Sequence, residues 1–562
     1  MTLLGVLLIG GFLTAGLHAG PVDWPQLLTS KTWYPDGGLF GVTAMLWGTA
    51  VVTGVALLLA VPVGWSAAIA LSEHLPERAA RPLRSGVELL AAVPSIVYGL
   101  VGIAAVRPLV ARLGDVPGGD SLLAAGLVLA VMVLPTVVAV SVDALCAVPQ
   151  EVREAARALG LTRSEVVRAA VLPLARPGLR AAVLLGLARA LGETIAVFLV
   201  IGRADGRLPH PGQLLASLFQ PGQTLTTKLG GPEPILAAAT GGHRAALCAV
   251  ALLLLVSVAA ATALGAARRP GPPVVRRRLF AVGRGRELRC RVHRLIGAGA
   301  VLLPLALLGG IFTLLAVRGS VALSPSFWTT PATGASGGGV RGQITGTLVL
   351  VLATGLLSLP VGVGLGLLLG EWAPPRAARA LRTATLTLGG VPTILLGLAG
   401  FALFGLALGW GKSWLAGVLV LSVIVVPVVA LSTATRLDQL PAADREAALS
   451  LGLTRSQLVR SVLLPWARPA VLTGLLLGLA RAAGETAPLL FTATVFAGAS
   501  ALPRGVVQSP VEALPAHIFA LAQDAADPAA LAAAWGSALV LVLLAGLLLL
   551  LAVPARRRLE LP

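Results

Sequence analysis

In this chain, the residues whose types and spacing best suit the binding of a ligand are two arginine–glutamate pairs. The peptide GLARALGET carries Arg189 and Glu193, and the peptide GLARAAGET carries Arg481 and Glu485. Both peptides lie in long apolar stretches, where an arginine at mid-bilayer depth costs roughly 2.5–3.5 kcal/mol on insertion scales. Each arginine is therefore expected to face an aqueous path or a paired group. A guanidinium group binds two oxygens of a tetrahedral oxyanion at once.

Two interpretations of these pairs stay open at this point. In the structural one, each arginine forms an ion pair with the glutamate one helical turn away. In the functional one, the two arginines converge on an anion across a pseudo-two-fold axis. Thr194 and Thr486 then add hydroxyl donors, and Gly192 and Gly484 allow close backbone approach. The interpretations are compatible, because the glutamate can hold the arginine until substrate arrives. We expect both peptides near the middle of a membrane span.

The pairs belong to an internal repeat. Residues 154–194 and 446–486 align without a gap, and 26 of these 41 positions are identical. GTAVVTGVALLLAVPVG at 48–64 also parallels GTLVLVLATGLLSLPVG at 346–362. A duplication of this length in an apolar chain predicts a transporter core made of two related halves.

Composition places the chain in the membrane. Its mean hydropathy is +0.90, with 56% hydrophobic and 12% charged residues, which excludes an ordinary soluble protein. Apolar runs of about 20 residues predict spanning helices. We predict an all-α membrane protein with about twelve transmembrane helices, near residues 3–19, 43–72, 86–107, 121–143, 178–203, 244–266, 294–317, 344–370, 385–409, 413–435, 471–497 and 534–555.

The distribution of basic residues predicts the topology. The net charge is +19, and residues 267–294 alone hold ten arginines and one glutamate. Arginines gather in alternate loops, as expected of cytoplasmic loops, so both termini are predicted to lie in the cytoplasm. This charge is interpreted as membrane topology, assisted by anionic lipid, and not as a nucleic-acid surface.

Three segments make up the predicted domain organisation. A first half at 1–266 and a second half at 294–562 contain six spans each, so they have the same orientation and form two parallel six-helix repeats. The stretch 267–293 is a basic cytoplasmic linker, and its proline and glycine content disfavours a helix.

A second repeated motif lies on the predicted cytoplasmic side, at 150–177 and 442–469. A short helix, a glycine turn and a second short helix ending before proline predict a compact hairpin. An ordinary amphipathic hairpin at the membrane surface is the alternative. The motif residues are Glu154, Ala155, Ala156, Gly160 and Pro173 in the first copy, and Glu446, Ala447, Ala448, Gly452 and Pro465 in the second. The motif resembles the EAA loop of ABC importer permeases, which inserts into a groove on the ATP-binding subunit.

No enzymatic apparatus is expected in this chain. GWGKS at 409–413 fails the phosphate-loop pattern because Leu406 stands where the first glycine belongs. Three cysteines without zinc spacing indicate neither a metal site nor a disulfide. We therefore predict no catalytic residues, no metal and no bound cofactor, with ATP used through a partner ATPase.

The resemblance becomes specific at four peptides. ELLAAVPSIVYGLVG at 88–102 and GLARALGETIAVFLVIG at 186–202 resemble PstC, one permease subunit of the phosphate-specific ABC importer family. GVPTILLGLAGF at 390–401 and GLARAAGETAPLLFTA at 478–493 resemble PstA, the other permease subunit. The resemblance covers nearly the whole chain and implies a gene fusion of the two subunits.

The resemblance also implies a fold, a membrane and partners. The fold is that of a type I ABC importer permease in the bacterial cytoplasmic (inner) membrane. The implied partners are an ABC ATPase dimer similar to PstB and an external phosphate-binding protein similar to PstS. A phosphate-sensing regulatory system is a further possible partner. Family members carry functionally important arginine and glutamate residues that map to Arg189, Glu193, Arg481 and Glu485.

Other functions stay open. A permease for sulfate, molybdate or phosphonate would share the EAA loop but is expected to lack the paired GLARxxGET helices. A secondary transporter built from parallel repeats is disfavoured by the duplicated EAA loop. A membrane scaffold that reports phosphate status to a sensor kinase is compatible with transport. For a phosphate importer, we hypothesise that Glu193 or Glu485 accepts the hydrogen bond of the phosphate proton and thereby excludes sulfate.

Overall fold

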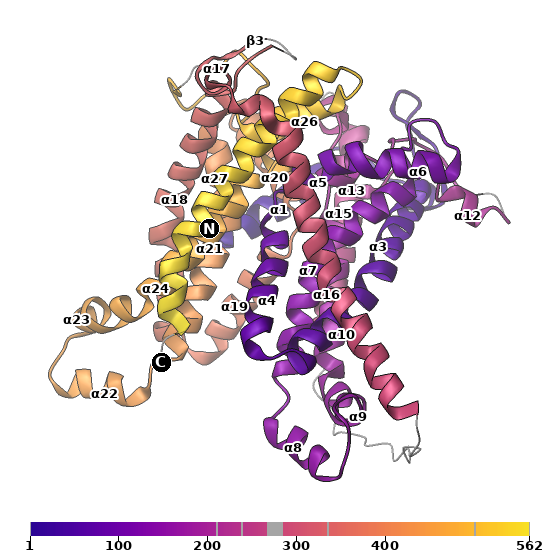
Figure 1. Cartoon of the computed structure of the whole chain (residues 1–562). Coiled ribbons are helices and arrows are strands. Elements are labelled where there is room, and N and C mark those ends of the chain that lie inside the picture. The colour runs from indigo at the N-terminus through magenta and orange to yellow at the C-terminus, as the bar shows by residue number, and fades with distance from the viewer. Residues whose placement is uncertain are drawn as a thin grey trace. The chain divides into compact units, whose positions relative to one another are not determined.

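The chain folds almost entirely into helices (Figure 1). The strands of the described part form two antiparallel hairpins, β1 (Trp33–Tyr34) with β2 (Leu39–Phe40) and β3 (Ala332–Thr333) with β4 (Gly337–Gly338). The predicted all-α class is confirmed. This computed structural model describes residues 2–209, 212–237, 240–266, 285–333, 337–499 and 502–560. The predicted linker at 267–293 lies largely outside the described residues, because 267–284 are not among them.

Ten helices in the described ranges are long and apolar enough to cross a membrane, and a bent pair is an eleventh candidate. The bent pair is α19 (Pro375–Gly389) with the helix Thr393–Ala407, which is α20 (Thr393–Gly400) continued by η8 (Phe401–Ala407). α1 (Thr2–Leu17) adds a shorter apolar helix. The ten are Thr43–His74, Ser95–Gly114, Leu122–Cys146, Arg163–Gly192, Gly241–Gly265, Val292–Leu323, Arg341–Trp372, Trp414–Asp438, Arg455–Gly484 and Pro528–Arg558.

Several of these spans consist of successive helical elements. In the first half these elements are α3 (Thr43–Ile69), η2 (Ala70–His74), α5 (Ser95–Val101), η3 (Gly102–Val106), α6 (Arg107–Gly114), α7 (Leu122–Cys146), α9 (Arg163–Val166), η4 (Val167–Val171), α10 (Leu172–Gly192) and α15 (Gly241–Ala266). In the second half they are α16 (Gly285–Arg318), η6 (Gly319–Leu323), α18 (Arg341–Leu367), η7 (Leu368–Trp372), α21 (Trp414–Asp438), α23 (Arg455–Leu458), η9 (Val459–Leu463), α24 (Leu464–Gly484) and α27 (Pro528–Glu560).

The remaining described helices are short or amphipathic. They are α2 (Trp24–Thr29), η1 (Pro35–Gly37), α4 (Glu77–Ala92), α8 (Gln150–Ala158), α11 (Ile195–Phe198), α12 (Leu214–Ser217), α13 (Leu225–Leu229), α14 (Glu233–Leu236), α17 (Pro325–Thr329), α22 (Ala442–Ser450), α25 (Ala487–Thr492) and α26 (Leu514–Gln523).

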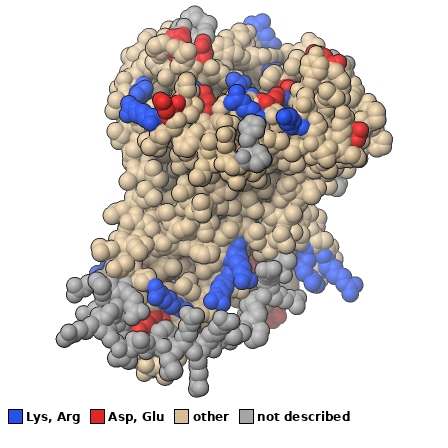
Figure 2. Space-filling view, turned by 90° about the vertical axis from the view of Figure 1, so that its right-hand side faces the viewer, with Lys and Arg blue, Asp and Glu red and all other residues tan. Residues whose placement is uncertain are grey.

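The surface agrees with a membrane location. On the face drawn in Figure 2, Lys, Arg, Asp and Glu side chains gather towards two ends, and the broad surface between them carries none of these charges. Lys and Arg are more frequent than Asp and Glu at the lower of the two ends in that view. An uncharged belt between charged ends is expected of a protein that crosses a lipid bilayer.

The third predicted span of each half is interrupted. The run at 86–107 is interrupted, since α4 ends at Ala92, and Val93 is extended before Pro94. The run at 385–409 breaks likewise, with a 92° bend between α19 and the next helix. The residue before proline disfavours the helical conformation, which explains a break that hydropathy does not detect.

The fifth span of each half is shifted along the chain. The predicted runs at 178–203 and 471–497 end early, because α10 stops at Gly192 and α24 stops at Gly484. Both helices instead begin further back, in continuous helical segments that start at Arg163 and Arg455. Glycine commonly terminates helices because its backbone is conformationally permissive.

The chain packs into two compact units that differ from the predicted halves. One unit contains 23–231 and 252–314 and is here called the first-half unit; the other contains 1–22, 232–251 and 315–562 and is called the second-half unit. The helix α1 therefore packs within the second-half unit, where Gly5 lies against Leu388 and Val423. The predicted halves at 1–266 and 294–562 describe the repeat in the sequence and remain a prediction. A repeat in the sequence does not specify where the first helix of each half packs.

The same close backbone contact occurs in both units. A Cβ atom at Gly48 would lie 2.1 Å from the carbonyl oxygen of Gln223, and one at Gly346 would lie 1.9 Å from that of Glu512. The next residue is a threonine in both cases, and its Oγ1 accepts a hydrogen bond from the first residue of α13 or α26. Glycine at these two positions allows each short helix to pack against the start of a span.

Candidate functional site

The first Arg–Glu pair lies at the C-terminal end of α10. Arg189 is in the last turn, and Glu193 follows Gly192 in an extended conformation. The Nε of Arg189 lies 3.7 Å from Oε1 of Glu193. A second contact fixes the guanidinium, because its Nη1 donates a hydrogen bond of 2.7 Å to Oγ1 of Thr136 on α7. The side chain of Arg189 is 29% exposed.

The second pair has the same place in the repeat but fewer restraints. Arg481 is in the last turn of α24, and its Nε donates to Oε1 of Glu485 at 3.5 Å. Val428 stands at the repeat position of Thr136, and a valine side chain offers no acceptor. The side chain of Arg481 is 50% exposed, well above the value for its counterpart.

The pairs are therefore at helix ends, and the prediction that both peptides lie near the middle of a span is wrong, because the helical segments end at Gly192 and Gly484. The break after the glycine gives them a different electrostatic setting. The carbonyl groups of a last helical turn have few backbone partners and carry partial negative charge, which favours a nearby arginine. The Glu193 N–H still donates to the Arg189 carbonyl at 3.2 Å, so the pair is connected through the backbone as well.

The threonines after the glutamates are buried. Oγ1 of Thr194 donates weakly to the Gly192 carbonyl at 3.5 Å. Oγ1 of Thr486 is buried and has no hydrogen-bond partner among the described residues. A buried hydroxyl without a partner costs about 1–3 kcal/mol, so this group is disposed to bind an incoming acceptor.

Three residues around the first pair belong to none of the predicted motifs. Besides Thr136, Oγ1 of Thr226 donates to the Glu193 carbonyl at 3.0 Å. Tyr98 is buried on α5, donates its hydroxyl to the Leu90 carbonyl, and lies close enough to Arg189 and Glu193 to interact electrostatically with both. One available signal was that Tyr98 is one of only two tyrosines in the chain and stands in an apolar run.

Short helices after each break support the pairs. In the first-half unit, α11 packs against α5, and a Cβ atom at Gly99 would lie 2.6 Å from Leu199. In the second-half unit, α25 packs against α20, and a Cβ atom at Gly397 would lie 2.6 Å from Cα of Pro488. These close approaches hold the chain that follows each glutamate against a neighbouring span.

Both EAA motifs form helical hairpins (Figure 1). The first hairpin connects α7 to α10, and the second connects α21 to α24. In the first, α8 is followed by Gly160 at φ +74° and then by α9. In the second, α22 is followed by Gly452 at φ +80° and then by α23. Left-handed backbone favours glycine, which explains the glycine in both turns. A capping box begins the second helix of each hairpin, with Thr162 and Glu165 in one and Thr454 and Gln457 in the other.

The faces of the hairpins are equivalent. Glu154 and Ala155 are exposed while Ala156 is buried, and the second copy repeats this pattern at Glu446, Ala447 and Ala448. The residue before each turn glycine is an exposed leucine that is not among the predicted motif residues. Leu159 is 81% exposed and Leu451 is 83% exposed.

The predicted end of each hairpin before proline is wrong. Pro173 and Pro465 lie at the start of α10 and α24, and the preceding residues are π-helical rather than a helix terminus. Proline lacks an N–H donor and is tolerated in a first helical turn. A π turn directly before it allows the helix to pass from the hairpin into the span without a stop.

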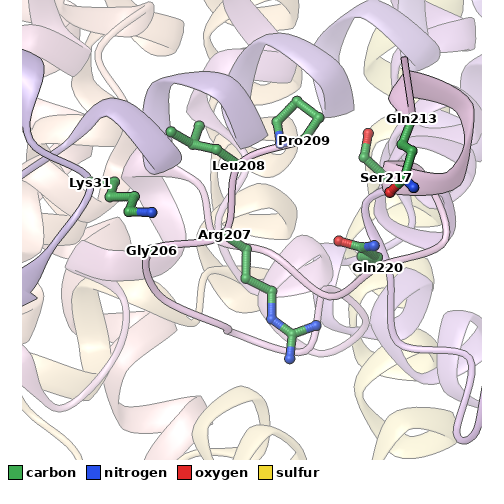
Figure 3. Close-up of a pocket in the computed structure, with 8 residues that line it drawn as sticks. All are labelled: Lys31, Gly206, Arg207, Leu208, Pro209, Gln213, Ser217 and Gln220. Carbon is green, nitrogen blue, oxygen red and sulfur yellow. The ribbon is translucent and has the colours of Figure 1, made fainter. Parts of the chain in front are cut away.

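The first-half unit also contains a cavity of about 490 Å³ on its loops, drawn in Figure 3. Lys31 and Arg207 are exposed basic residues in its lining, which includes no carboxylate. Gln213, Ser217 and Gln220 line another side. None of the predicted site residues lines this cavity. No group of His, Cys, Asp and Glu side chains suited to a metal ion is found in the described ranges.

Comparison with known proteins gives consistent matches. The family described as "Binding-protein-dependent transport system inner membrane component" matches residues 60–269 and again residues 362–558. The probable ABC transporter permease protein YqgH of Bacillus subtilis is 38% identical over 226 residues, which are 40% of this chain and 69% of the relative.

Two further relatives are phosphate transport system permease proteins. PstC of Mesorhizobium japonicum is 35% identical over 250 residues, which are 40% of this chain and 74% of that protein. PstC 2 of Mycobacterium tuberculosis is 43% identical over 208 residues, which are 34% of this chain and 62% of that protein. The double family match confirms that the chain contains two related halves.

Proposed function

Because this chain belongs to the family of inner membrane components of binding-protein-dependent transport systems, we propose that it supplies both membrane halves of an ATP-driven importer of inorganic phosphate. The observation that carries the proposal is the duplicated hairpin, present at the same place in both repeats with the same exposed face. The resemblance of the first half to PstC and of the second to PstA extends the proposal to a fusion of two permease subunits.

The hairpins are proposed to bind a separate ATPase dimer. Each presents the glutamate and the first alanine of its motif, together with Leu159 or Leu451, to the outside. An exposed leucine beside small and charged residues is typical of a patch that becomes the apolar centre of an interface. The EAA residues Glu154, Ala155, Ala156, Gly160, Pro173, Glu446, Ala447, Ala448, Gly452 and Pro465 are the proposed coupling set.

The Arg–Glu pairs are proposed to bind the transported anion. A planar guanidinium can donate to two phosphate oxygens, and release from a long ion pair of 3.5–3.7 Å costs little compared with a short buried one. Thr194 and Thr486 follow each pair, and the unsatisfied hydroxyl of Thr486 is a donor for the same ligand. Glu193 or Glu485 is proposed to accept a hydrogen bond from the phosphate proton, which sulfate lacks at neutral pH.

The transport cycle follows from these roles. An external phosphate-binding protein delivers phosphate to the permease in the bacterial inner membrane, and the termini lie in the cytoplasm. ATP binding closes the ATPase dimer and moves the hairpins, and the spans respond by alternating access. ATP hydrolysis takes place on the partner and not on this chain.

Uptake of labelled phosphate into vesicles tests the proposal. The vesicles contain this chain with an ATPase subunit and a binding protein, and uptake is measured with and without ATP and with excess sulfate. ATP-dependent uptake that sulfate does not reduce is the expected result. Uptake abolished by sulfate would favour a permease for another oxyanion, and uptake independent of ATP would contradict the ABC mechanism.

A further inference from the structure

A buried arginine connects the first hairpin to two spans. Arg153 is the residue directly before the EAA motif, and its side chain is only 9% exposed. Its Nη2 lies 2.8 Å from Oε1 of Glu73, and its Nε donates to both carboxylate oxygens at 3.2 and 3.4 Å. The same guanidinium donates to the carbonyl groups of Leu145, at 2.7 Å, and of Val148.

These contacts join three segments that are far apart in the sequence. Arg153 belongs to α8 of the hairpin, and Glu73 lies in η2, the π turn that ends the first long span. The carbonyl groups belong to the C-terminal end of α7 and the residues just after it. The carbonyl groups at a helix C-terminus are without intrahelical partners, and a guanidinium satisfies them well.

The second half repeats this arrangement in a weaker form. Arg445 Nε lies 3.2 Å from Oε2 of Glu371, which is in the corresponding π turn η7. Arg445 Nη2 donates to the Leu437 carbonyl at 2.7 Å, and Nη1 donates to the Leu440 carbonyl at 3.2 Å. Its side chain is 24% exposed, and its Nε lacks hydrogen-bond geometry to any described acceptor.

Packing alone does not account for a charged pair at this place. Removing two charges from water is expensive, and a well-packed apolar pair of similar volume is often as stable. An ion pair in addition satisfies carbonyl groups with directional bonds and so fixes the relative orientation of the joined segments. The same three-way connection occurs in both repeats, directly before the motif proposed to bind the ATPase.

We propose that Glu73–Arg153 and Glu371–Arg445 are positioning pairs that make each hairpin move as one body with its two spans. The first pair does not face the ATPase, since Arg153 and Glu73 are both buried, and the side chains of Arg445 and Glu371 in the second pair are only 24% and 19% exposed. Their part is to transmit displacement of the hairpin to α3 and α7, or to α18 and α21. This inference rests on the proposed function, because it requires a partner ATPase that moves the hairpins.

The test compares phosphate transported per ATP hydrolysed in reconstituted vesicles. Glu73→Gln and Arg153→Lys are expected to lower this ratio by about fivefold, a typical size for coupling between distant sites. Association with the ATPase should stay unchanged, because the exposed docking face is untouched. Arg81→Gln is the matched control, since Arg81 forms an exposed ion pair with Glu77 and both residues lie on α4.

A covalent cross-link between the two positions distinguishes a positioning role of the pair from a role in stability alone. In a chain in which Cys146, Cys248 and Cys290 are replaced by serine, Glu73→Cys with Arg153→Cys should lower the ratio. A short bifunctional thiol reagent that joins the two cysteines should restore it, and cleaving a reducible version of that reagent should lower it again. Glu371→Gln provides a second, less buried site if the first variants fail to fold.

Two results would overturn the inference. The ratio could stay at the wild-type value in all variants, or uptake and ATP hydrolysis could fall in proportion, as a loss of folded protein predicts. Both outcomes presuppose that the wild-type chain transports phosphate with ATP. A wild-type chain without such uptake would instead contradict the proposed function.

Discussion

The two Arg–Glu helix ends carry almost the same peptide but differ in what surrounds them. In the first half, Thr136 accepts a hydrogen bond from Arg189, and Thr226 donates to the Glu193 carbonyl. In the second half, Val428 stands at the repeat position of Thr136, and Pro515 follows Leu514 as Thr226 follows Leu225, so neither position carries a hydroxyl. The exposed fraction of the arginine side chain rises from 29% to 50% accordingly.

This difference indicates that the two Arg–Glu pairs have different roles. An arginine fixed by a neighbouring hydroxyl is pre-organised but must break a contact before it can bind a new ligand on that nitrogen. An exposed arginine with one long ion pair is free to reach an anion. We therefore expect the second-half pair to contribute more to phosphate binding and the first-half pair to contribute more to the rigidity of its helix end.

The largest expected effect is that of Arg481→Lys on phosphate uptake. Lysine keeps the charge but loses the planar pair of donors, so uptake should fall by about 100-fold, which corresponds to about 2.7 kcal/mol. Arg189→Lys should cost about tenfold, because part of that guanidinium already binds Thr136. The measurement is kcat/KM for phosphate uptake at equal amounts of folded protein. An equal or larger loss for Arg189→Lys would reverse the comparison.

The hairpins provide the opposite case, in which the two halves should behave alike. Leu159 and Leu451 are 81% and 83% exposed before glycines of similar φ, so an aspartate should be equally harmful at either position. We expect Leu159→Asp and Leu451→Asp each to weaken ATPase association by about 30-fold, through a charge placed in an apolar contact. Binding of the ATPase to permease in detergent measures the effect.

The conservative variants Leu159→Met and Leu451→Met are the controls for these substitutions. They keep the apolar surface and should bind the ATPase as the wild-type chain does. A large difference between the two aspartate variants would show that the asymmetry of the halves extends to the hairpins. No effect of either variant would remove these leucines from the proposed docking face.

Discrimination against sulfate is the next effect in size. Glutamine at Glu193 or Glu485 keeps the side-chain length but replaces one acceptor oxygen with a donor amide. Sulfate should then inhibit phosphate uptake at about tenfold lower concentration, with the larger change at Glu485 because its arginine is the more exposed. Competition by unlabelled sulfate measures this. Unchanged uptake with unchanged rejection of sulfate in both variants would rule out a selective role for the carboxylates.

Much of the fold could be predicted from the sequence because its main signals are local. Apolar length predicts spans, and the repeat predicts two related halves. The topology expected from the alternating basic loops stays a prediction. The breaks after Gly192 and before Pro94 were missed, since mean hydropathy averages over a helix and the interruption that follows it. The packing of α1 in the second-half unit depends on tertiary contacts, for which a repeat alignment contains no information.

In the candidate site too, local sequence signals predict the motifs but not the residues that tertiary contacts bring to them. The Arg–Glu spacing and the EAA hairpins follow from motifs of fixed length, so the sequence predicted both. Thr136 and Arg153 are 53 and 80 residues from the partners that they contact, Arg189 and Glu73. Neither is one of the motif residues named from the sequence, and only tertiary packing brings them into contact with these partners.

The smallest expected effect comes from exchanging the residues that distinguish the two sites. Thr136→Val should remove the hydrogen bond to Arg189 and make the first site resemble the second, and Val428→Thr should do the reverse. One such bond is worth about 1 kcal/mol, so each change should alter kcat/KM for phosphate by about fivefold or less.

The informative quantity is the coupling between these substitutions and the arginines. In a Thr136→Val background, Arg189→Lys should become more harmful and approach the cost of Arg481→Lys, whereas Val428→Thr should make Arg481→Lys less harmful. Double-mutant cycles on phosphate uptake measure both couplings, and the thermal stability of each variant controls for folding. Couplings near zero would mean that the hydroxyl does not cause the difference between the two arginines. That difference would then originate in the helices α11 and α25 that follow them.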